Sequence, residues 1–240
     1  KIFLHSKKLY MIFENELISG TLIKRYKRFF VDIKVKNKVI TAHCPNTGSM
    51  MGLLKKGNKV WLTKSNDIKR KLKYTLQIIE VNGSKIGVNT HLTNKIFYES
   101  LLNGNIINLK KTDILFREKQ FNKNTRFDFF IKQKNKGIFI EVKNVTLSRF
   151  KNIAEFPDAV TERGLKHINE LLAAKKKGFD VYLAFVIQRE DCKKFKIAAD
   201  IDPNYKKLLT VALKNNLKVI CYDCKFSSKG IIINNKINFI

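Results

Sequence analysis

The hydrophobic pattern of this 240-residue chain changes character near residue 90. Before that point, short apolar runs alternate with turn residues, and no long helical period is found. Lys36-Asn-Lys38 and Asn82-Gly-Ser84 are the clearest turn signals, and the second is typical of a tight hairpin. We interpret the following runs as strands: 18–25, 29–35, 39–44, 60–63, 72–81 and 85–90. Short strands with this punctuation predict a small β-barrel or sandwich over residues 1–90.

Residues 91–240 show a different order, in which helical and strand patterns alternate. Helices are predicted over 94–102 and 157–177, the second with Pro157 in its first turn, and a third helix follows the N-cap pair Asp202-Pro203. Strands are predicted at 114–121, 126–131, 137–142, 181–188 and 217–222. This is an α/β order, so the chain is predicted to have two domains, 1–90 and 91–240.

The charge of the chain indicates a polyanionic partner. Its 48 Lys and Arg against 20 Asp and Glu give a net charge of +28, which argues against an ordinary enzyme of small neutral metabolites. Forty of the basic residues are Lys, a bias that an AT-rich genome would also produce. A field of this strength nevertheless attracts nucleic acid whatever its origin, and such binding is sensitive to salt. Half of the net charge, +14, lies in residues 1–90.

No segment of the sequence predicts membrane insertion or secretion. The longest apolar run, 181–187, is far shorter than the roughly 20 residues that cross a bilayer. Residues 1–10 lack the apolar core of a secretory signal, and Met11 has the position of a natural start, so we interpret them as a leader or a misassigned start. The four Cys are too scattered for a disulfide framework. A cytoplasmic location is expected.

Two acidic residues stand in otherwise apolar strands of the second domain. Asp128 and Glu141 flank a predicted hairpin, and a turn centred on Lys134-Asn135 would place them opposite each other. Two carboxylates about 5 Å apart raise each other's pKa and favour a hard divalent cation such as Mg²⁺ or Mn²⁺. Lys143 lies two residues after Glu141 and therefore on the same face. An alternative is a purely structural ion-pair cluster with Arg126 and Lys143.

Asp followed by Glu-x-Lys on adjacent strands resembles the PD-(D/E)XK phosphodiesterase superfamily. Four longer motifs narrow this resemblance: His43-Cys-Pro-Asn-Thr-Gly-Ser-Met50, Arg126-Phe-Asp-Phe129, Glu141-Val-Lys-Asn-Val-Thr-Leu147 and the segment 156–171. Together they resemble the sugar fermentation stimulation protein A (SfsA) family from about Met11 to the C-terminus. The resemblance implies an N-terminal OB-type barrel followed by a PD-(D/E)XK-like domain with a mixed central sheet. It also implies DNA binding without strong sequence preference and a regulatory role in sugar, notably maltose, metabolism.

The superfamily resemblance also assigns roles to individual residues. Asp128 and Glu141 match the metal-binding acids, Lys143 matches the catalytic lysine, and the Val142 carbonyl is a further candidate ligand. Glu99 on the first helix and Glu118 on the preceding strand are rivals for an additional acid, and the choice between them is open. Arg163, Lys166 and His167 lie close together on the predicted helix of the last motif. Their spacing alone is typical of an exposed helix face. As part of the motif, these residues are instead expected to contact phosphates.

Basic residues of the first domain are the expected contacts to the nucleic-acid backbone. They occur beside aromatic residues at Arg25, Lys27 and Arg28, and as a dense run at Lys69, Arg70, Lys71 and Lys73. Thr47 and Ser49 lie in a Pro-Asn-Thr-Gly-Ser segment that is either a plain turn or a phosphate-binding loop. Cys221 and Cys224 have half-site spacing for zinc, but no second pair supports it.

The sequence therefore predicts a two-domain DNA-binding protein with a Mg²⁺- or Mn²⁺-dependent, nuclease-like site. A non-cleaving DNA-binding regulator and an RNA-binding protein are the two alternatives, because basic and aromatic side chains do not distinguish DNA from RNA. Many nucleases of the superfamily dimerise, so a homodimer is a further expectation of the resemblance.

Overall fold

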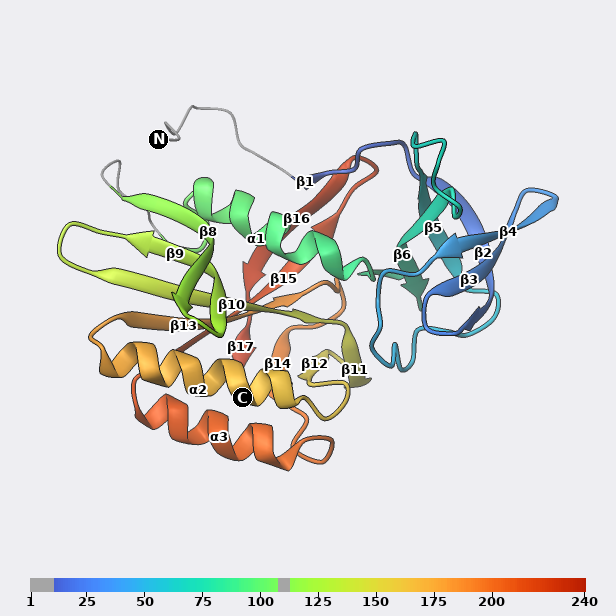
Figure 1. Cartoon of the computed structure of the whole chain (residues 1–240). Coiled ribbons are helices and arrows are strands. Elements are labelled where there is room, and N and C mark those ends of the chain that lie inside the picture. Colours follow the sequence, from blue (N-terminus) through green and yellow to red (C-terminus); the bar gives the residue numbers. More distant parts are fainter. Residues whose placement is uncertain (1–10, 108–112) are drawn as a thin grey trace.

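The computed structural model describes residues 11–107 and 113–240. Two sheets dominate it, a six-stranded sheet curled into a barrel and a seven-stranded sheet between helices (Figure 1). The predicted leader, residues 1–10, lies outside the described residues. Within the described residues, we find no helix long and apolar enough to cross a membrane.

The barrel is built from strands between residues 18 and 87, in the spatial order β4-β3-β2-β5-β6-β7. Its strands are β2 (Ile18–Tyr26), β3 (Phe30–Val35), β4 (Lys38–His43), β5 (Lys59–Lys64), β6 (Tyr74–Val81) and β7 (Ser84–Gly87). The barrel closes where β4 meets β6 through the pair His43–Thr75. Closure pairs the backbone groups that an open sheet would leave at its edges. Inward residues such as Leu22, Ile33 and Leu62 are fully buried in its core.

The seven-stranded sheet has the order β1-β16-β15-β13-β10-β9-β8. Its strands are β1 (Met11–Ile12), β8 (Ile114–Asn122), β9 (Thr125–Lys132), β10 (Gly137–Val145), β13 (Asp180–Ile187), β15 (Lys218–Phe226) and β16 (Gly230–Lys236). The β10–β13–β15 centre is parallel and both flanks are antiparallel, so the predicted mixed sheet is confirmed. Strand β1 precedes the barrel in the chain but pairs with β16 in this sheet. Residues 11 and 12 therefore lie in the seven-stranded sheet, although the predicted boundary put them in the barrel domain, 1–90.

Helices cover both faces of this sheet. Helix α1 (Thr93–Leu102) follows the short 3-10 helix η1 (Thr90–Leu92) and packs on one face through Ile96, Phe97 and Leu101. Helices α2 (Glu162–Lys176) and α3 (Pro203–Lys214) pack on the other face (Figure 1). The predicted N-cap of α3 is confirmed, because the Asp202 carboxylate accepts a hydrogen bond from Tyr205 N at 2.9 Å.

A small four-stranded sheet completes the second domain and was not predicted. It consists of β11 (Leu147–Phe150), β12 (Ile153–Phe156), β14 (Lys194–Ile197) and β17 (Asn238–Phe239), in the order β11-β12-β14-β17. One prediction is corrected in this region. Pro157 does not begin α2: it follows β12 through a cis peptide bond, and Thr161 is the N-cap instead.

Candidate functional site

The acid pair lies where strands β9 and β10 separate. The predicted register holds from Lys132–Gly137 to Phe129–Ile140, and the backbone ladder ends there. Beyond it, one oxygen of Asp128 accepts a hydrogen bond from Val142 N at 2.7 Å, and the other accepts one from Asn94 Nδ2 at 2.7 Å. The predicted cross-strand pair Asp128–Glu141 is therefore corrected: the Asp128 side chain replaces the missing strand neighbour of Val142. This arrangement fixes the carboxylate between β10 and the first turn of α1.

Glu141 is held from the opposite side of the sheet by two basic groups. Its Oε1 accepts a hydrogen bond from Lys143 Nζ at 2.9 Å and also contacts His167 Nδ1 on α2. Lys143 Nζ and His167 Nδ1 are themselves 2.8 Å apart. The prediction that Lys143 shares the face of Glu141 is thus confirmed. Only 3% of Glu141 is exposed, so this three-residue cluster is shielded from solvent.

The two acids have opposite electrostatic environments. Burial and the nearby charge of Glu141 raise the pKa of Asp128 to about 6, against the opposing effect of its hydrogen bonds. Burial alone would also raise the pKa of Glu141, but the hydrogen bonds and charges of His167 and Lys143 outweigh it and lower that pKa. Glu141 is consequently ionised at neutral pH, and its charge disfavours ionisation of Asp128. A divalent cation beside Asp128 would relieve this repulsion.

The donor set suits a hard cation that keeps part of its water shell. Each Asp128 oxygen accepts one described hydrogen bond and retains a second lone pair for a ligand. Mg²⁺ is commonly bound by one or two carboxylates and several waters, so two acids suffice in principle. Among residues 11–107 and 113–240, no group of three or more His, Cys, Asp or Glu side chains is placed to hold a metal.

The two candidates for an additional acid occupy different places. Glu99 on α1 has a buried Oε2 without a hydrogen-bond partner among the described residues, and burial raises its pKa against the opposing charge of Lys95. Glu118 on β8 is exposed and has a φ of 51°. Its chain neighbours, Arg117 and Lys119, pair with Phe129 and Phe127 of β9. Glu118 lines the cavity beside α2 that is described below, whereas the described charged neighbour of Glu99 is Lys95. The choice between the two acids stays open.

A broad basic cavity opens next to this cluster. It has a volume of about 500 Å³, and it lies between the β8–β9 hairpin and α2. Its lining includes Arg126, Arg163, Lys166 and His167, so the structure brings the three predicted phosphate contacts of α2 together. Arg163 and Lys166 are exposed, and Lys166 Nζ donates to the Asn124 carbonyl at 3.0 Å. His167 reaches from this cavity to Glu141 and so connects the basic surface to the acid pair.

The predicted basic contacts of the barrel fall into two groups. Lys27, Arg28, Lys69 and Lys71 are exposed. The others are engaged within the barrel: Arg25 donates to the carbonyls of Asn46, Gly48 and Arg28, Arg70 donates to Thr75, and Lys73 donates to the carbonyls of Asp67 and Ile68. Arg25 holds the 46–48 loop in place. Among the residues that the structure describes, the first group takes part in no ion pair, so these side chains are available to contact a phosphate backbone.

The candidate phosphate-binding loop forms hydrogen bonds with a carboxylate of the protein itself. Ser49 donates its N–H and its hydroxyl to Asp158 Oδ2, and the neighbouring Thr47 is exposed. In strand β15 of the seven-stranded sheet, Cys221 and Cys224 are buried free thiols whose pKa values are raised, chiefly by burial. A thiolate pair for zinc is disfavoured by that burial.

Comparison with known proteins agrees with both halves of this architecture. Residues 23–88 match the family described as the SfsA N-terminal OB domain. Residues 91–230 match the sugar fermentation stimulation protein RE domain. This chain belongs to the SfsA family. The predicted OB-type barrel and the predicted family membership are thereby confirmed.

Individual relatives cover nearly the whole chain. A sugar fermentation stimulation protein homolog from Pelagibacter ubique (strain HTCC1062) is 50% identical over 96% of this chain and 99% of its own length. A homolog from Sinorhizobium medicae (strain WSM419) is 38% identical over 92% of this chain and 94% of its own. Pyrococcus furiosus SfsA, solved in complex with Ca²⁺, matches with a TM-score of 0.85 and 23% identity, covering 97% of this chain and 99% of that SfsA chain.

Two residues that hold other side chains in place were not predicted from the sequence. Asn94 holds Asp128 from α1, and Asp158 holds Ser49 from the segment before α2. Asp158 lies inside the motif at 156–171, which was the available signal, whereas nothing in the local sequence around Asn94 distinguishes it from a first-turn helix residue.

Proposed function

We propose that this SfsA-family chain binds DNA with little sequence preference and carries a Mg²⁺- or Mn²⁺-dependent phosphodiesterase site of the PD-(D/E)XK type. The observation that carries the proposal is the contact of Glu141 with both Lys143 and His167, one strand away from Asp128 and beside the basic cavity. Candidate metal-binding acids, a lysine and basic side chains lie close together there. Metal-assisted phosphodiester hydrolysis can use these three kinds of group together.

The roles of the residues follow from their contacts. Asp128 and Glu141, with the Val142 carbonyl, would hold the cation, and Asn94 fixes the orientation of Asp128. The cation would supply Lewis-acid stabilisation of charge on the phosphate. Lys143 Nζ lies 2.9 Å from Glu141 Oε1, and in this proposal it would orient a water or neutralise a phosphate oxygen. Arg163 and Lys166 would bind the flanking phosphates from the rim of the cavity.

Two further observations support the metal and the nucleic acid. The relative from Pyrococcus furiosus was solved with Ca²⁺, which shares the oxygen-ligand preference of Mg²⁺. The net charge of +28 supplies the sequence-independent part of DNA affinity, with Lys69 and Lys71 of the barrel as expected backbone contacts. The family name suggests a regulatory role in sugar metabolism, and a cytoplasmic protein, as a monomer or a homodimer, is part of this proposal.

A second candidate function is a DNA-binding regulator that does not cleave. It is favoured by one specific contact: Glu141 is already neutralised by Lys143 and His167, which compete with a cation for the same oxygen. RNA binding is the third candidate, because basic side chains that bind phosphates do not recognise the 2′-OH.

One experiment separates these functions. Supercoiled plasmid is incubated with the protein in Mg²⁺, Mn²⁺ or EDTA, and gel shifts are run on the same samples at two salt concentrations and with RNA of equal length. Asp128→Asn and Lys143→Ala are the site variants, and Glu162→Gln on the exposed first turn of α2 is the control. We expect metal-dependent nicking that the site variants lose while their shift persists. A shift without nicking in any metal would support the regulator, and preferential binding of RNA would support the third candidate.

A further inference from the structure

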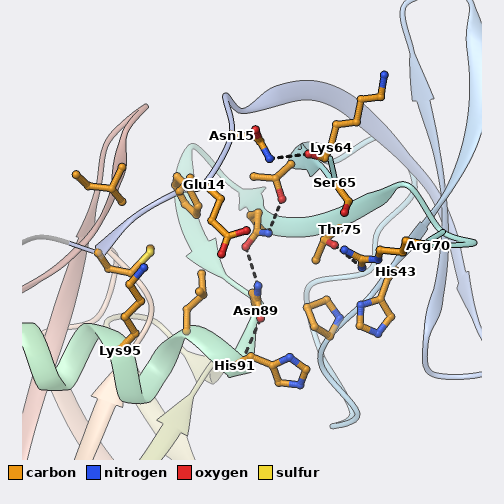
Figure 2. A pocket seen from close by; sticks show the side chains of 17 residues that line it. Glu14, Asn15, His43, Lys64, Ser65, Arg70, Thr75, Asn89, His91 and Lys95 are labelled. Atoms are coloured by element: carbon orange, nitrogen blue, oxygen red, sulfur yellow. Dashed lines mark hydrogen bonds between the residues drawn. The ribbon is translucent and has the colours of Figure 1, made fainter. Parts of the chain in front are cut away.

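A second cavity lies at the junction of the barrel and the second domain. It has a volume of about 290 Å³ and is lined by β4, β5 and β6 of the barrel, by the start of α1 and by the segment after β1. Figure 2 shows side chains from these elements converging on it. It shares no lining residue with the basic cavity beside Glu141. Its size is at the lower end of the range of ligand sites, so it suits a small molecule or one end of a larger one.

Three basic side chains gather at one end of this cavity. His43 and Arg70 lie side by side in Figure 2, and His91 of η1 also lines the cavity. Arg70 is fixed because its Nη2 donates to Thr75 Oγ1 at 2.7 Å, and Thr75 is the ladder partner of His43 at the closure of the barrel. Burial, and then the charges of Arg70 and His91, lower the pKa of His43. Arg70 and His91 are therefore both close enough to His43 to act on it electrostatically.

The polar groups around this cluster are committed to one another. Asn89 Nδ2 donates to Gln77 Oε1 at 2.9 Å, and Gln77 Nε2 donates to Thr63 Oγ1 at 2.8 Å. Asn89 Oδ1 accepts from His91 N at 3.1 Å, which positions the η1 turn. These neutral contacts hold the wall rigid without neutralising its charge. Rigid walls reduce the entropic cost of binding a ligand.

No acid compensates the basic cluster within the described part of the chain. His43, Arg70 and His91 take part in none of the ion pairs found among residues 11–107 and 113–240. Glu14 is the single acidic side chain among the described lining residues. Lys95 of α1 adds a further positive charge to the lining, whereas the Lys64 side chain points away in Figure 2. The cavity thus has an unpaired positive end.

We propose that this cavity binds a phosphate monoester, with Arg70, His43 and His91 as its phosphate ligands. A guanidinium fixed at one nitrogen still presents a fork of donors to a tetrahedral anion, and two imidazoles add donors from other directions. The Thr75 hydroxyl, already bonded to Arg70, keeps that fork in place. A compact dianion matches both the volume and the charge of this end of the cavity.

Two sources would supply this chemistry: the terminal phosphate of a nucleic-acid strand or a small phosphorylated molecule. The proposal does not depend on cleavage at Asp128. Two neighbouring residues of α1 nevertheless connect the cavity with the acid pair: Asn94 holds Asp128, and Lys95 lines the cavity. An occupant of the cavity would therefore restrain the helical turn that positions Asp128.

The test is a titration with inorganic phosphate followed by NMR of the imidazole nitrogens. His43 and His91 are expected to shift saturably with a common dissociation constant, while His167 beside Glu141 serves as an internal reference for binding elsewhere. Arg70→Gln is expected to weaken phosphate binding about tenfold or more, because it removes a charge-assisted hydrogen bond. Lys56→Gln removes one positive charge from an exposed turn of the same barrel and should leave the affinity for phosphate unchanged. Arg70→Lys keeps the charge and should retain part of the affinity.

Each outcome decides the matter. Absence of saturable shifts at His43 and His91, or equal weakening by Arg70→Gln and Lys56→Gln, would overturn the proposal. The source is then resolved with two single-stranded oligonucleotides that differ in a 5′-phosphate or a 5′-hydroxyl. Tighter binding of the phosphorylated strand, lost in Arg70→Gln, identifies a strand end; equal binding of both strands, with phosphate still bound, identifies a small molecule. The Asp128→Asn variant should keep phosphate binding, which separates this proposal from the nuclease proposal.

Discussion

Ser49 and Asp158 join the barrel to the second domain through a single carboxylate oxygen. Ser49 donates its N–H at 2.9 Å and its hydroxyl at 3.3 Å to Asp158 Oδ2, although 109 residues separate the two in sequence. A Cβ at Gly48 would clash with the same oxygen, so a larger residue there would displace the Asp158 carboxylate. The loop that we predicted to bind phosphate therefore donates its hydrogen bonds to a carboxylate of the protein itself. A carboxylate and a phosphate have similar hydrogen-bonding chemistry.

This contact leads to a prediction on DNA affinity. Asp158→Asn should raise the affinity for DNA at low salt by roughly twofold to fivefold, because it removes a negative charge from the loop and frees donors for phosphate. Unfolding free energy should fall by about 1 kcal/mol, since a charged hydrogen-bond acceptor is lost. Gel shifts and chemical denaturation measure the two effects. Glu162→Gln removes an exposed acid nearby, and an equal gain in that variant would show that the loop itself is irrelevant.

Metal binding at the acid pair should be visible without turnover. Mg²⁺ or Ca²⁺ at about ten times its dissociation constant should stabilise the native protein by roughly 1.4 kcal/mol, because only the folded state presents Asp128 and Glu141 together. Thermal unfolding with and without the cation measures this. Asp128→Asn should abolish the increase in Tm, and Asn94→Ala should reduce it, because Asn94 orients the Asp128 carboxylate. An unchanged increase in Asp128→Asn would place the cation elsewhere.

The acid stability of the second domain should depend on Arg149. Its guanidinium donates to both oxygens of Glu155 at 2.8 Å, and the Glu155 side chain is 0% exposed. Arg149→Ala should cost about 3 kcal/mol, since it leaves a buried carboxylate without its main partner. A smaller loss for Arg149→Lys is expected because the charge is kept and the fork is lost.

The same pair predicts a pH dependence. Burial alone would raise the pKa of Glu155, but the hydrogen bonds from Arg149 lower it below its usual value. A carboxyl whose folded pKa is lowered stabilises the fold above its unfolded pKa, about 4.3, and this contribution is lost as the pH falls through the folded pKa. Wild-type stability should therefore drop more steeply below about pH 4.3 than that of Arg149→Ala. Parallel pH profiles of the two proteins would contradict this reasoning.

Salt dependence should locate the DNA track on the barrel. Lys69 and Lys71 are exposed in the loop between β5 and β6, and each phosphate contact contributes about 0.9 to the slope of log K against log salt. Lys69→Ala and Lys71→Ala should each lower the slope by about that amount and weaken all sequences alike. Lys207→Ala on the exposed face of α3 is the matched control. Slopes that fall equally in all three variants would indicate that only net charge matters.

Local signals were sufficient where neighbours in sequence determine the structure. The turn at Lys134-Asn135 set the register of β9 and β10 as far as Phe129–Ile140, and Asp202-Pro203 began α3 as predicted. Short strands such as β14 and β17 were missed because their partners, β12 and β14, lie far away in the chain. The proline signal failed at Pro157, where the fold uses the residue in a connection before α2 rather than at a helix start.

By itself, the sequence determined the two-domain order, the charge and the acids Asp128 and Glu141 with Lys143, because these depend on composition, periodicity and spacing. Only the tertiary structure decided which groups surround those residues. His167 and Asn94 reach the two acids from helices on opposite faces of the sheet, and Asp158 reaches Ser49 from the other domain. Arg70, His43 and His91 line one cavity, and this arrangement likewise depends on closure of the barrel. Such contacts arise from packing between distant segments, and no local pattern encodes the distance between them.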